Sequence, residues 1–141
     1  MHDSDWTIVE TEFDLTRLHS KETVFTLGNG YLSTRGAFEE GFTRAWPITF
    51  IHGVYDLVPI FYTELVNCPD WLPLVVVVDG ARFSLERGTL LSYRRELNLR
   101  NGLLVREVRW QSPAGHTVDL RFERMVSLAD NHDHGLLRMR R

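Results

Sequence analysis

Three short stretches carry residue types that could do chemistry. Glu39 and Glu40 are adjacent carboxylates, and cleavage of a glycosidic bond needs two carboxyl groups that flank the bond. Adjacent residues of an extended chain point to opposite sides, so we interpret this pair as part of a solvated loop. His132 and His134 fall on one side of an extended segment and could hold a metal ion with a third ligand. No third ligand is evident in the sequence, and we expect no metal site.

Asp70 and Trp71 follow Pro69 and form the third stretch. An exposed tryptophan face beside a carboxylate can stack a sugar ring, but a tryptophan next to a long apolar strand is more often part of the core. We favour the core interpretation. The spacing of the remaining side chains reveals no Ser-His-Asp or Cys-His arrangement.

Length and composition limit the class of protein that could position these residues. The chain has 141 residues, of which 43% are hydrophobic and 25% charged, as in one globular domain or part of a larger one. Its longest apolar run, Trp71 to Val78, is far shorter than the roughly 20 residues of a membrane helix. The start of the chain is acidic and lacks the apolar core of a secretory signal. The single cysteine, Cys68, fits a reducing compartment, and we expect a cytoplasmic protein without a membrane partner. A net charge of -3 gives no reason to expect nucleic acid.

The run Leu27 to Gly36 predicts a tight β-hairpin. Asn29 and Gly30 stand between the alternating segments Val24 to Leu27 and Tyr31 to Arg35, and an Asn-Gly pair suits the two positive φ angles of a type I′ turn. The glycine spacing matches neither a dinucleotide fingerprint nor a P-loop, and no helix follows. This stretch is therefore a structural hairpin and not a phosphate-binding loop.

Alternating or apolar runs between turn residues predict short strands along the rest of the chain. We expect Thr16 to Thr23 to be a connection, Leu57 to Val66 to be a strand or one helical turn, and no long amphipathic helix. The expected strands include Trp6–Phe13, Leu74–Val78, Ala81–Glu86, Thr89–Leu99, Leu103–Gln111 and His116–Val126. Asp79 and Gly80 form a second two-residue hairpin signal.

Turn lengths predict how the last strands pair. A two-residue loop at Asn101 and Gly102 sets Tyr93 opposite Trp110 and Leu99 opposite Leu104. A three-residue loop, Pro113 to Gly115, matches the faces of the next pair of strands and predicts a bulge with Gly115 in the left-handed conformation. It sets Trp110 opposite Val118, Val108 opposite Leu120, Arg109 opposite Asp119 and Glu107 opposite Arg121. The sequence therefore predicts an all-β, antiparallel sandwich with one packed and one charged face.

Ordered blocks along the chain carry a family resemblance. The run Glu22 to Gly36 resembles the start of glycoside hydrolase family 65, which contains maltose, trehalose and kojibiose phosphorylases and hydrolytic relatives. The resemblance covers nearly the whole chain from Trp6, while Ser33 and His134 depart from the usual family residues. The other blocks are Gly53–Asp56, Glu64–Asn67 with Pro69 and Trp71, Asp79–Gly80, Asn98–Gly102, Arg106, Trp110 with Ser112, Pro113 and Gly115, Phe122–Arg124, Ser127–Asp130 and His132.

This resemblance implies a galactose-mutarotase-like β-super-sandwich in front of a helical linker and an (α/α)6 barrel. The general acid and the phosphate-binding residues of the family lie in that barrel, so we expect residues 1–141 to be a truncated N-terminal domain without catalytic residues or a cofactor. Inorganic phosphate would be the co-substrate of the parent enzyme if it is a phosphorylase. The choice of α-glucoside, and of phosphate or water as the acceptor, would be made in the barrel.

The resemblance also sets the expected partners and sites. We expect the domain to serve as scaffold and interface for its own catalytic domain, with Arg35 and Glu39 nearest to that neighbour. Exposed strand edges and an uncovered apolar face would make the isolated segment dimerise or aggregate. Two alternatives remain: a free-standing carbohydrate-binding sandwich that uses Tyr55, Trp71 and the carboxylate of Asp70, and a purely structural or oligomerisation module.

Overall fold

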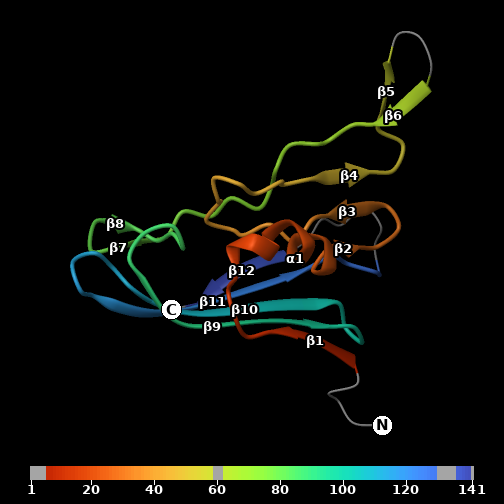
Figure 1. Cartoon of the computed structure of the whole chain (residues 1–141). Coiled ribbons are helices and arrows are strands. Elements are labelled where there is room, and N and C mark those ends of the chain that lie inside the picture. The colour runs from red at the N-terminus through yellow and green to blue at the C-terminus, as the bar shows by residue number, and fades with distance from the viewer. Residues whose placement is uncertain (1–5, 59–61, 130–135, 141) are drawn as a thin grey trace.

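A five-stranded antiparallel sheet forms the base of the molecule (Figure 1). The computed structural model describes residues 6–58, 62–129 and 136–140. The strand order in this sheet is β1-β9-β10-β11-β12. The strands are β1 (Thr7–Glu10), β9 (Thr89–Asn98), β10 (Leu103–Gln111), β11 (Thr117–Met125) and β12 (Leu136–Arg140). Strands β9, β10 and β11 follow one another as predicted, β12 adds a further strand beside β11, and β1 lies at the other edge beside β9.

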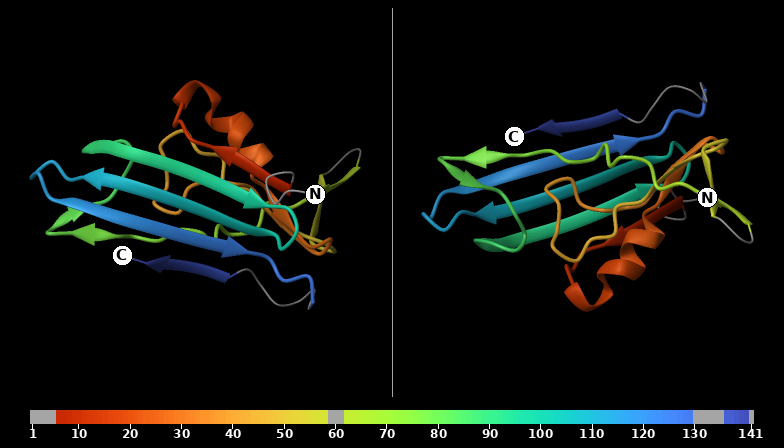
Figure 2. Two further views of the ribbon diagram at one scale, coloured as in Figure 1. Left: turned by 90° about the horizontal axis from the view of Figure 1, so that it is seen from below. Right: turned by 90° about the horizontal axis from the view of Figure 1, so that it is seen from above.

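A second layer lies over one face of this sheet and contains a three-stranded sheet of order β2-β3-β4 and the pair β7-β8. Seen from below, the other face of the large sheet has no described element across it (Figure 2). The two layers confirm the predicted all-β sandwich. The layer comprises η2 (Leu15–Arg17), α1 (Leu18–Val24), β2 (Leu27–Gly28), β3 (Leu32–Thr34), β4 (Thr49–Ile51), β7 (Val77–Val78) and β8 (Ala81–Arg82).

Side-chain alternation in the large sheet builds the core between the layers. Residues such as Tyr93, Val108 and Trp110 point inward, where Phe38 and Phe83 of the second layer pack against them. The ring of Phe83 meets that of Trp110 edge-on with centroids 5.4 Å apart, the geometry that aromatic pairs prefer. The opposite side of the same strands carries exposed charged side chains such as Arg94, Glu107 and Arg109. The predicted packed face and charged face are therefore present, although the packed face also contains buried arginines.

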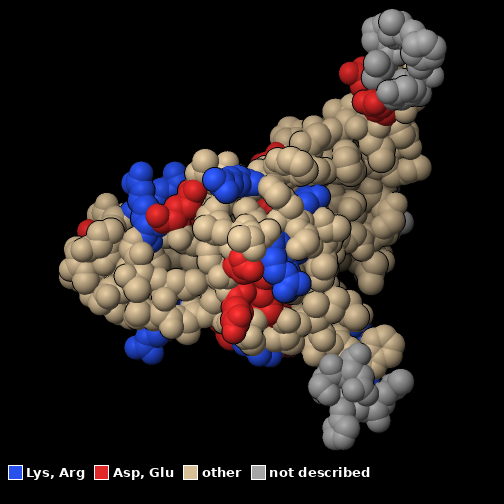
Figure 3. Space-filling view, in the orientation of Figure 1, with Lys and Arg blue, Asp and Glu red and all other residues tan. Residues whose placement is uncertain are grey.

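A two-stranded arm projects from the second layer (Figure 1). It consists of β5 (Tyr55–Val58) and β6 (Tyr62–Leu65), which pair with each other and with no other described strand. Tyr55 lies opposite Leu65, and Asp56 lies opposite Glu64. Figure 3 shows acidic side chains on this arm next to the residues drawn in grey. Tyr55, Leu57 and Leu65 thus share one face of the arm, its apolar face, and Asp56 and Glu64 lie on the other.

The predicted pairing of β9 with β10 is wrong by two residues. Tyr93 lies opposite Val108, and Asn98 lies opposite Leu103, so the loop contains Leu99 to Gly102 and not only Asn101 and Gly102. The backbone N–H of Gly102 donates to the carbonyl of Asn98 at 2.9 Å and closes this longer loop. A further irregularity between Arg109 and Trp110 shifts the register again.

The next hairpin agrees with the prediction. Trp110 pairs with Val118, Val108 with Leu120, Arg109 with Asp119 and Glu107 with Arg121. Ser112 donates from its backbone N–H to the carbonyl of His116 at 2.8 Å, and Gly115 has φ +90°. The three-residue loop and the left-handed glycine are therefore confirmed.

The Asn29-Gly30 hairpin exists, but the predicted type I′ turn is wrong. Asn29 pairs with Leu32 through a backbone hydrogen bond of 3.1 Å, so Gly30 and Tyr31 form the turn. Gly30 has φ +87°, and Asp79 is the only non-glycine residue of the described chain with a positive φ, which fits a type II′ turn. The Oδ1 atom of Asn29 accepts from the N–H groups of Tyr31 and Leu32 and holds Asn29 in front of the turn. Asp79 and Gly80, with φ 48° and 82°, form the two-residue turn of the predicted second hairpin.

The predicted connection over Thr16 to Thr23 is wrong, because this stretch forms η2 and α1. Asp14 caps the first turn by accepting from the N–H of Thr16 at 2.8 Å. In α1 only Leu18 and Glu22 are buried, and the two apolar residues, Leu18 and Val24, are too few to give a helical period. Val24, predicted as strand, ends this helix. Within the described residues, no helix is long and apolar enough to cross a membrane.

Candidate functional site

Glu39 and Glu40 are buried, and the prediction of a solvated loop is wrong. Arg106 of β10 donates from Nη2 to Glu39 Oε2 at 2.8 Å and from Nη1 to Glu40 Oε1 at 2.8 Å. Pairing with one guanidinium compensates the cost of burying two carboxylates. The prediction failed because it considered only the local chain, whereas the partner comes from a distant strand.

Arg106 is the centre of a row of buried arginines on the inner face of the large sheet. We call Arg95 of β9, Arg106 of β10 and Arg124 of β11 the arginine row; each side chain is almost fully buried. Arg95 and Arg106 are opposite each other across the two strands. Phenyl rings cover the guanidinium faces, with Arg106 Cζ 4.6 Å from the ring centroid of Phe38 and 4.4 Å from that of Phe122.

The arginine row fixes segment 36–40 on the sheet. Arg95 donates from Nη2 to the carbonyl of Gly36, and Arg124 donates from Nη2 to the carbonyl of Ala37 at 3.2 Å. Gly36 is required here, because an added Cβ would lie 2.8 Å from Phe25 Cβ and 2.9 Å from Arg95 Nη2. The segment that contains Glu39, one of the predicted site residues, is thus part of the core.

The electrostatics of the row follow from burial and pairing. Burial by itself would lower the pKa of Arg106, but the attraction of the Glu40 and Glu39 carboxylates is stronger and raises the pKa of this side chain. Burial would raise the pKa of Glu39, but Arg106, Arg124 and Arg95 together lower it below its ordinary value of 4.5. Burial lowers the pKa of Arg95, and it lowers the pKa of Arg124 to about 10. Glu39, Arg106 and Arg124 are therefore charged at neutral pH, which favours a structural over an acid–base role.

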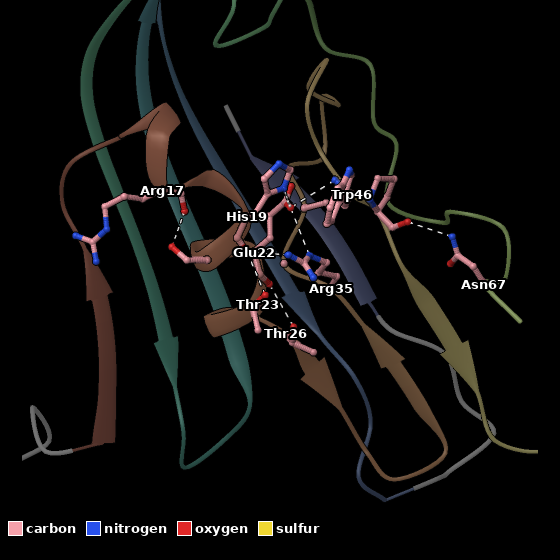
Figure 4. Close-up of polar contacts among 12 residues, drawn as sticks. Arg17, His19, Glu22, Thr23, Thr26, Arg35, Trp46 and Asn67 are labelled. Atoms are coloured by element: carbon pink, nitrogen blue, oxygen red, sulfur yellow. Dashed lines mark hydrogen bonds and ion pairs between the residues drawn. The ribbon is translucent and has the colours of Figure 1, made fainter. Parts of the chain in front are cut away.

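Arg35 lies in a second polar cluster, at the surface beside α1 (Figure 4). We call His19, Arg35 and Trp46 the Trp46 patch, with Glu22 beneath it. Glu22 is fully buried, and its Oε2 atom lies 3.4 Å from His19 Nδ1, from Arg35 Nε and from the backbone N of Trp46. Arg35 also donates from Nη2 to the carbonyl of His19 at 2.7 Å. The carboxylate therefore joins helix α1 to two loops of the second layer.

An exposed aromatic surface covers this cluster. The rings of His19 and Trp46 are in contact, with centroids 4.5 Å apart and planes tilted by 34°, and Trp46 is 60% exposed. Tryptophan is frequent among the residues that dominate protein interfaces. The Trp46 patch has an apolar ring, a charged guanidinium and a histidine side by side, which suits a docking contact.

Tyr55 lies elsewhere, on β5 of the arm, and is half-exposed. With Leu65 it forms one wall of a groove of about 410 Å³ whose other lining residues include Tyr31, Leu32 and Phe50. The groove runs between the arm and the β2-β3-β4 sheet and is mostly apolar. It is the second surface that could receive a neighbouring segment.

Asp70 and Trp71 lie in the connection between β6 and β7. Asp70 is exposed, and its Oδ1 atom accepts from the N–H of Leu72 at 3.1 Å as a turn cap. Trp71 is only partly exposed and its Nε1 atom is buried, without a hydrogen-bond partner among the residues that the structure describes. Arg35, Glu39 and Tyr55 are thus in three different environments, and none of the predicted residues forms a catalytic pair.

No described group of three or more His, Cys, Asp or Glu side chains could hold a metal ion. His132 and His134, the pair considered for a metal, lie outside the described residues. The structure therefore offers two surfaces and one buried charge cluster as candidates for function.

Sequence reasoning missed His19, Glu22, Trp46 and the arginine row as functional candidates. A signal existed for the arginines, because Arg95 stands between Tyr93 and Leu97 and Arg106 between Leu104 and Val108 on alternating apolar positions. A charge at such a position must find a buried partner. For Trp46 the sequence contains no signal, because its exposure depends on how the loop folds over α1.

Comparisons with known proteins identify relatives of this arrangement. The family described as glycosyl hydrolase family 65, N-terminal domain, matches residues 8–137. A kojibiose phosphorylase of Halothermothrix orenii is 44% identical over 128 residues, which cover 91% of this chain and 16% of that protein. An alpha,alpha-trehalose phosphorylase of Thermoanaerobacter brockii is 35% identical, with coverage of 91% and 18%.

A solved structure has the same fold. It is a putative kojibiose phosphorylase from the human microbiome, with a TM-score of 0.81 at 21% identity, and the match covers 91% of this chain and 18% of that one. The chain thus spans less than a fifth of the length of the relatives it matches, and it belongs to the glycosyl hydrolase family 65 N-terminal domain family.

Proposed function

We propose that this chain is the N-terminal, non-catalytic domain of an inverting phosphorylase or hydrolase that acts on an α-glucoside disaccharide such as maltose, trehalose or kojibiose. This proposal rests on two observations. The family model matches residues 8–137, and the chain spans only 16% to 18% of the length of its relatives. The parent enzyme works in the cytoplasm and, if it is a phosphorylase, uses inorganic phosphate as co-substrate.

The charge pairing supports a non-catalytic role. An inverting enzyme needs one carboxylic acid to protonate the glycosidic oxygen, with phosphate or water attacking from the opposite face. Glu39 and Glu40 cannot serve as such a pair, because both are held by Arg106 in the core. The acid and the phosphate site belong to a separate catalytic domain.

The domain contributes a rigid scaffold and an interface. The arginine row locks segment 36–40 to the sheet, and the chain then runs to the exposed Trp46. Trp46 and the groove beside Tyr55 are the surfaces that we assign to the contact with the catalytic domain. Burial of an exposed tryptophan is a large favourable term in such a contact.

Activity assays test the proposed division of labour. The purified 141-residue chain, given phosphate and kojibiose, trehalose or maltose, is expected to release no glucose 1-phosphate and no glucose, whereas the parent enzyme cleaves one of these sugars. In the parent enzyme, Trp46→Asp is expected to lower the melting temperature more than the control Trp6→Asp, which changes a tryptophan that is 37% exposed. Sugar cleavage by the isolated chain would refute the non-catalytic role.

One observation favours a second candidate, a carbohydrate-binding role. Trp46 presents an indole that is 60% exposed beside the imidazole of His19, and such a ring can stack a sugar. Titration calorimetry with maltose or kojibiose distinguishes the two roles. Saturable binding that is lost in Trp46→Ala and kept in Trp6→Ala supports the carbohydrate-binding role. If the wild-type chain shows no heat of binding, this second candidate is refuted.

A further inference from the structure

Two Asn-Gly pairs stand at turns of this fold, Asn29 with Gly30 and Asn101 with Gly102. The side chain of an asparagine can react with the backbone nitrogen of the next residue, and glycine favours this reaction because it has no Cβ to block the approach. Both pairs are therefore chemically competent by sequence. Which of them reacts in the folded protein depends on how the structure holds each asparagine.

The fold holds the side chain of Asn29 at both of its polar atoms. Its Oδ1 atom accepts from the N–H groups of Tyr31 at 3.0 Å and Leu32 at 2.8 Å, and its Nδ2 atom donates to the carbonyl of Ser127 at 2.7 Å. The last bond joins the hairpin to a residue 98 positions later in the chain. Movement of this side chain therefore breaks a contact between distant segments.

Asn101 is restrained only weakly by the described residues. It is exposed, in the loop between β9 and β10, where its Oδ1 atom accepts from the N–H of Leu103 at 3.0 Å. Its Nδ2 atom has no hydrogen-bond partner in the part of the chain that the structure describes. The backbone N–H of Gly102 donates to the carbonyl of Asn98 at 2.9 Å. Both bonds lie within the loop and its first flanking residues, so they open without disturbing the two layers.

We propose that Asn101 is a site of spontaneous deamidation and that the fold protects Asn29 from the same reaction. Hydroxide takes the proton of the Gly102 nitrogen, which attacks Cγ of Asn101. The new N–Cγ bond forms, the Cγ–Nδ2 bond breaks, and ammonia leaves with a proton taken from water. Water then opens the cyclic imide at one of its two carbonyl carbons and gives aspartate or isoaspartate, so one water molecule is consumed for each ammonia released. This proposal does not depend on the activity of the parent enzyme.

The products also fit one position better than the other. At position 29, a carboxylate oxygen would replace the Nδ2 donor and face the carbonyl of Ser127, where two acceptors repel each other. At position 101 the new carboxylate stays in water. The additional tertiary hydrogen bond of Asn29 corresponds to a rate about tenfold lower than that of Asn101.

Peptide mapping by mass spectrometry tests the proposal on the purified chain after incubation at mildly alkaline pH, where hydroxide accelerates the attack. Aspartate and isoaspartate are expected to accumulate at position 101 about tenfold faster than at position 29. In Asn101→Gln the longer side chain does not close the same ring, and the product at position 101 is expected to be lost.

The chain unfolded in urea is the matched control. Unfolding removes the contacts of both asparagines, and since each precedes a glycine, they are expected to react at similar rates. Three results would each overturn the proposal: an Asn101 that reacts in urea but not in the folded chain, a folded-state rate at Asn29 equal to or above that at Asn101, and a protection of Asn29 that persists in urea.

Discussion

At the scale of single residues, Arg106 joins two carboxylates inside the core. It pairs with two carboxylates and lies between two phenyl rings. Arg106→Met is expected to leave Glu39 and Glu40 buried without their main partner and to lower the free energy of unfolding by about 4 kcal/mol. Urea denaturation followed by circular dichroism measures this loss.

The matched control is Arg109→Met in the same strand. Arg109 points to the open face, where it lies 3.8 Å from the exposed Asp119. Its substitution is expected to change the free energy of unfolding by less than ~1 kcal/mol. Equal losses in the two variants would show that the buried pairing contributes nothing specific.

Glu39 makes stability dependent on pH. Its pKa is lowered in the folded state from 4.5, so its contribution is present above that value and is lost as the pH falls through the folded pKa. Glu39→Gln removes this titration, and the variant is expected to lose less stability than the wild type between about pH 4.5 and pH 2. Urea denaturation at several pH values measures how the free energy of unfolding of each protein changes with pH. An equal pH dependence in the wild type and in Glu39→Gln would contradict the role of Glu39.

The same residues show what a sequence can predict. The alternation of Tyr93, Arg95 and Leu97 places an arginine on the apolar face, which is local information. Its surroundings, Gly36 and the rings of Phe25 and Phe38, come from a segment about 60 residues earlier in the chain. Glu39 was predicted as a domain-facing residue for the same reason: no local pattern indicates a partner on a distant strand.

At the scale of elements, Gly88 sets the entry to β9. It has φ +71°, and an added Cβ would lie 2.4 Å from the carbonyl oxygen of Gln111 and 2.7 Å from Trp110 Nε1. Gly88→Ala combines an unfavourable backbone conformation with a collision in the core and is expected to cost about 3 kcal/mol. Thermal and urea denaturation measure the loss.

Gly102 is the control for this substitution. It has φ +66° but no atom within 4 Å of an added Cβ, so Gly102→Ala is expected to cost only about 1 kcal/mol. The difference between the two variants isolates the contribution of close packing. If Gly88→Ala costs no more stability than Gly102→Ala, close packing at Gly88 contributes nothing and the prediction is wrong.

Turns whose conformation is determined by their own residues could be predicted from the sequence. Turns that depend on contacts with distant residues could not. Asp79 with Gly80, and Gly115 with its proline, supply every conformation that their hairpins need. Asn29 was misplaced because its side chain caps the turn and also donates from Nδ2 to the carbonyl of Ser127 at 2.7 Å. Helix α1 was missed because its buried face includes a carboxylate, Glu22.

At the scale of the whole molecule, the described residues leave much of the apolar face of the arm exposed. Leu57 is 78% exposed, and Tyr55 and Leu65 are about half-exposed on the same side of the β5-β6 pair. A two-stranded hairpin is marginally stable by itself, and Asp56 opposite Glu64 is a like-charge pair that weakens it further. The arm therefore gains from a partner that buries its apolar side.

In the isolated chain, a second copy can supply that partner. We expect the chain to self-associate at micromolar concentration through the apolar face of the arm, because burial of Leu57 and Tyr55 contributes at about 25 cal/mol per Å². Leu57→Asp is expected to weaken association at least tenfold, since it places a carboxylate in that contact. The control is Leu15→Asp, which changes a leucine that is 50% exposed on η2, far along the chain from the arm. Sedimentation velocity from 1 to 100 μM measures both variants, and a wild-type chain that stays monomeric over this range, or equal weakening by both substitutions, would remove the arm as the site of association.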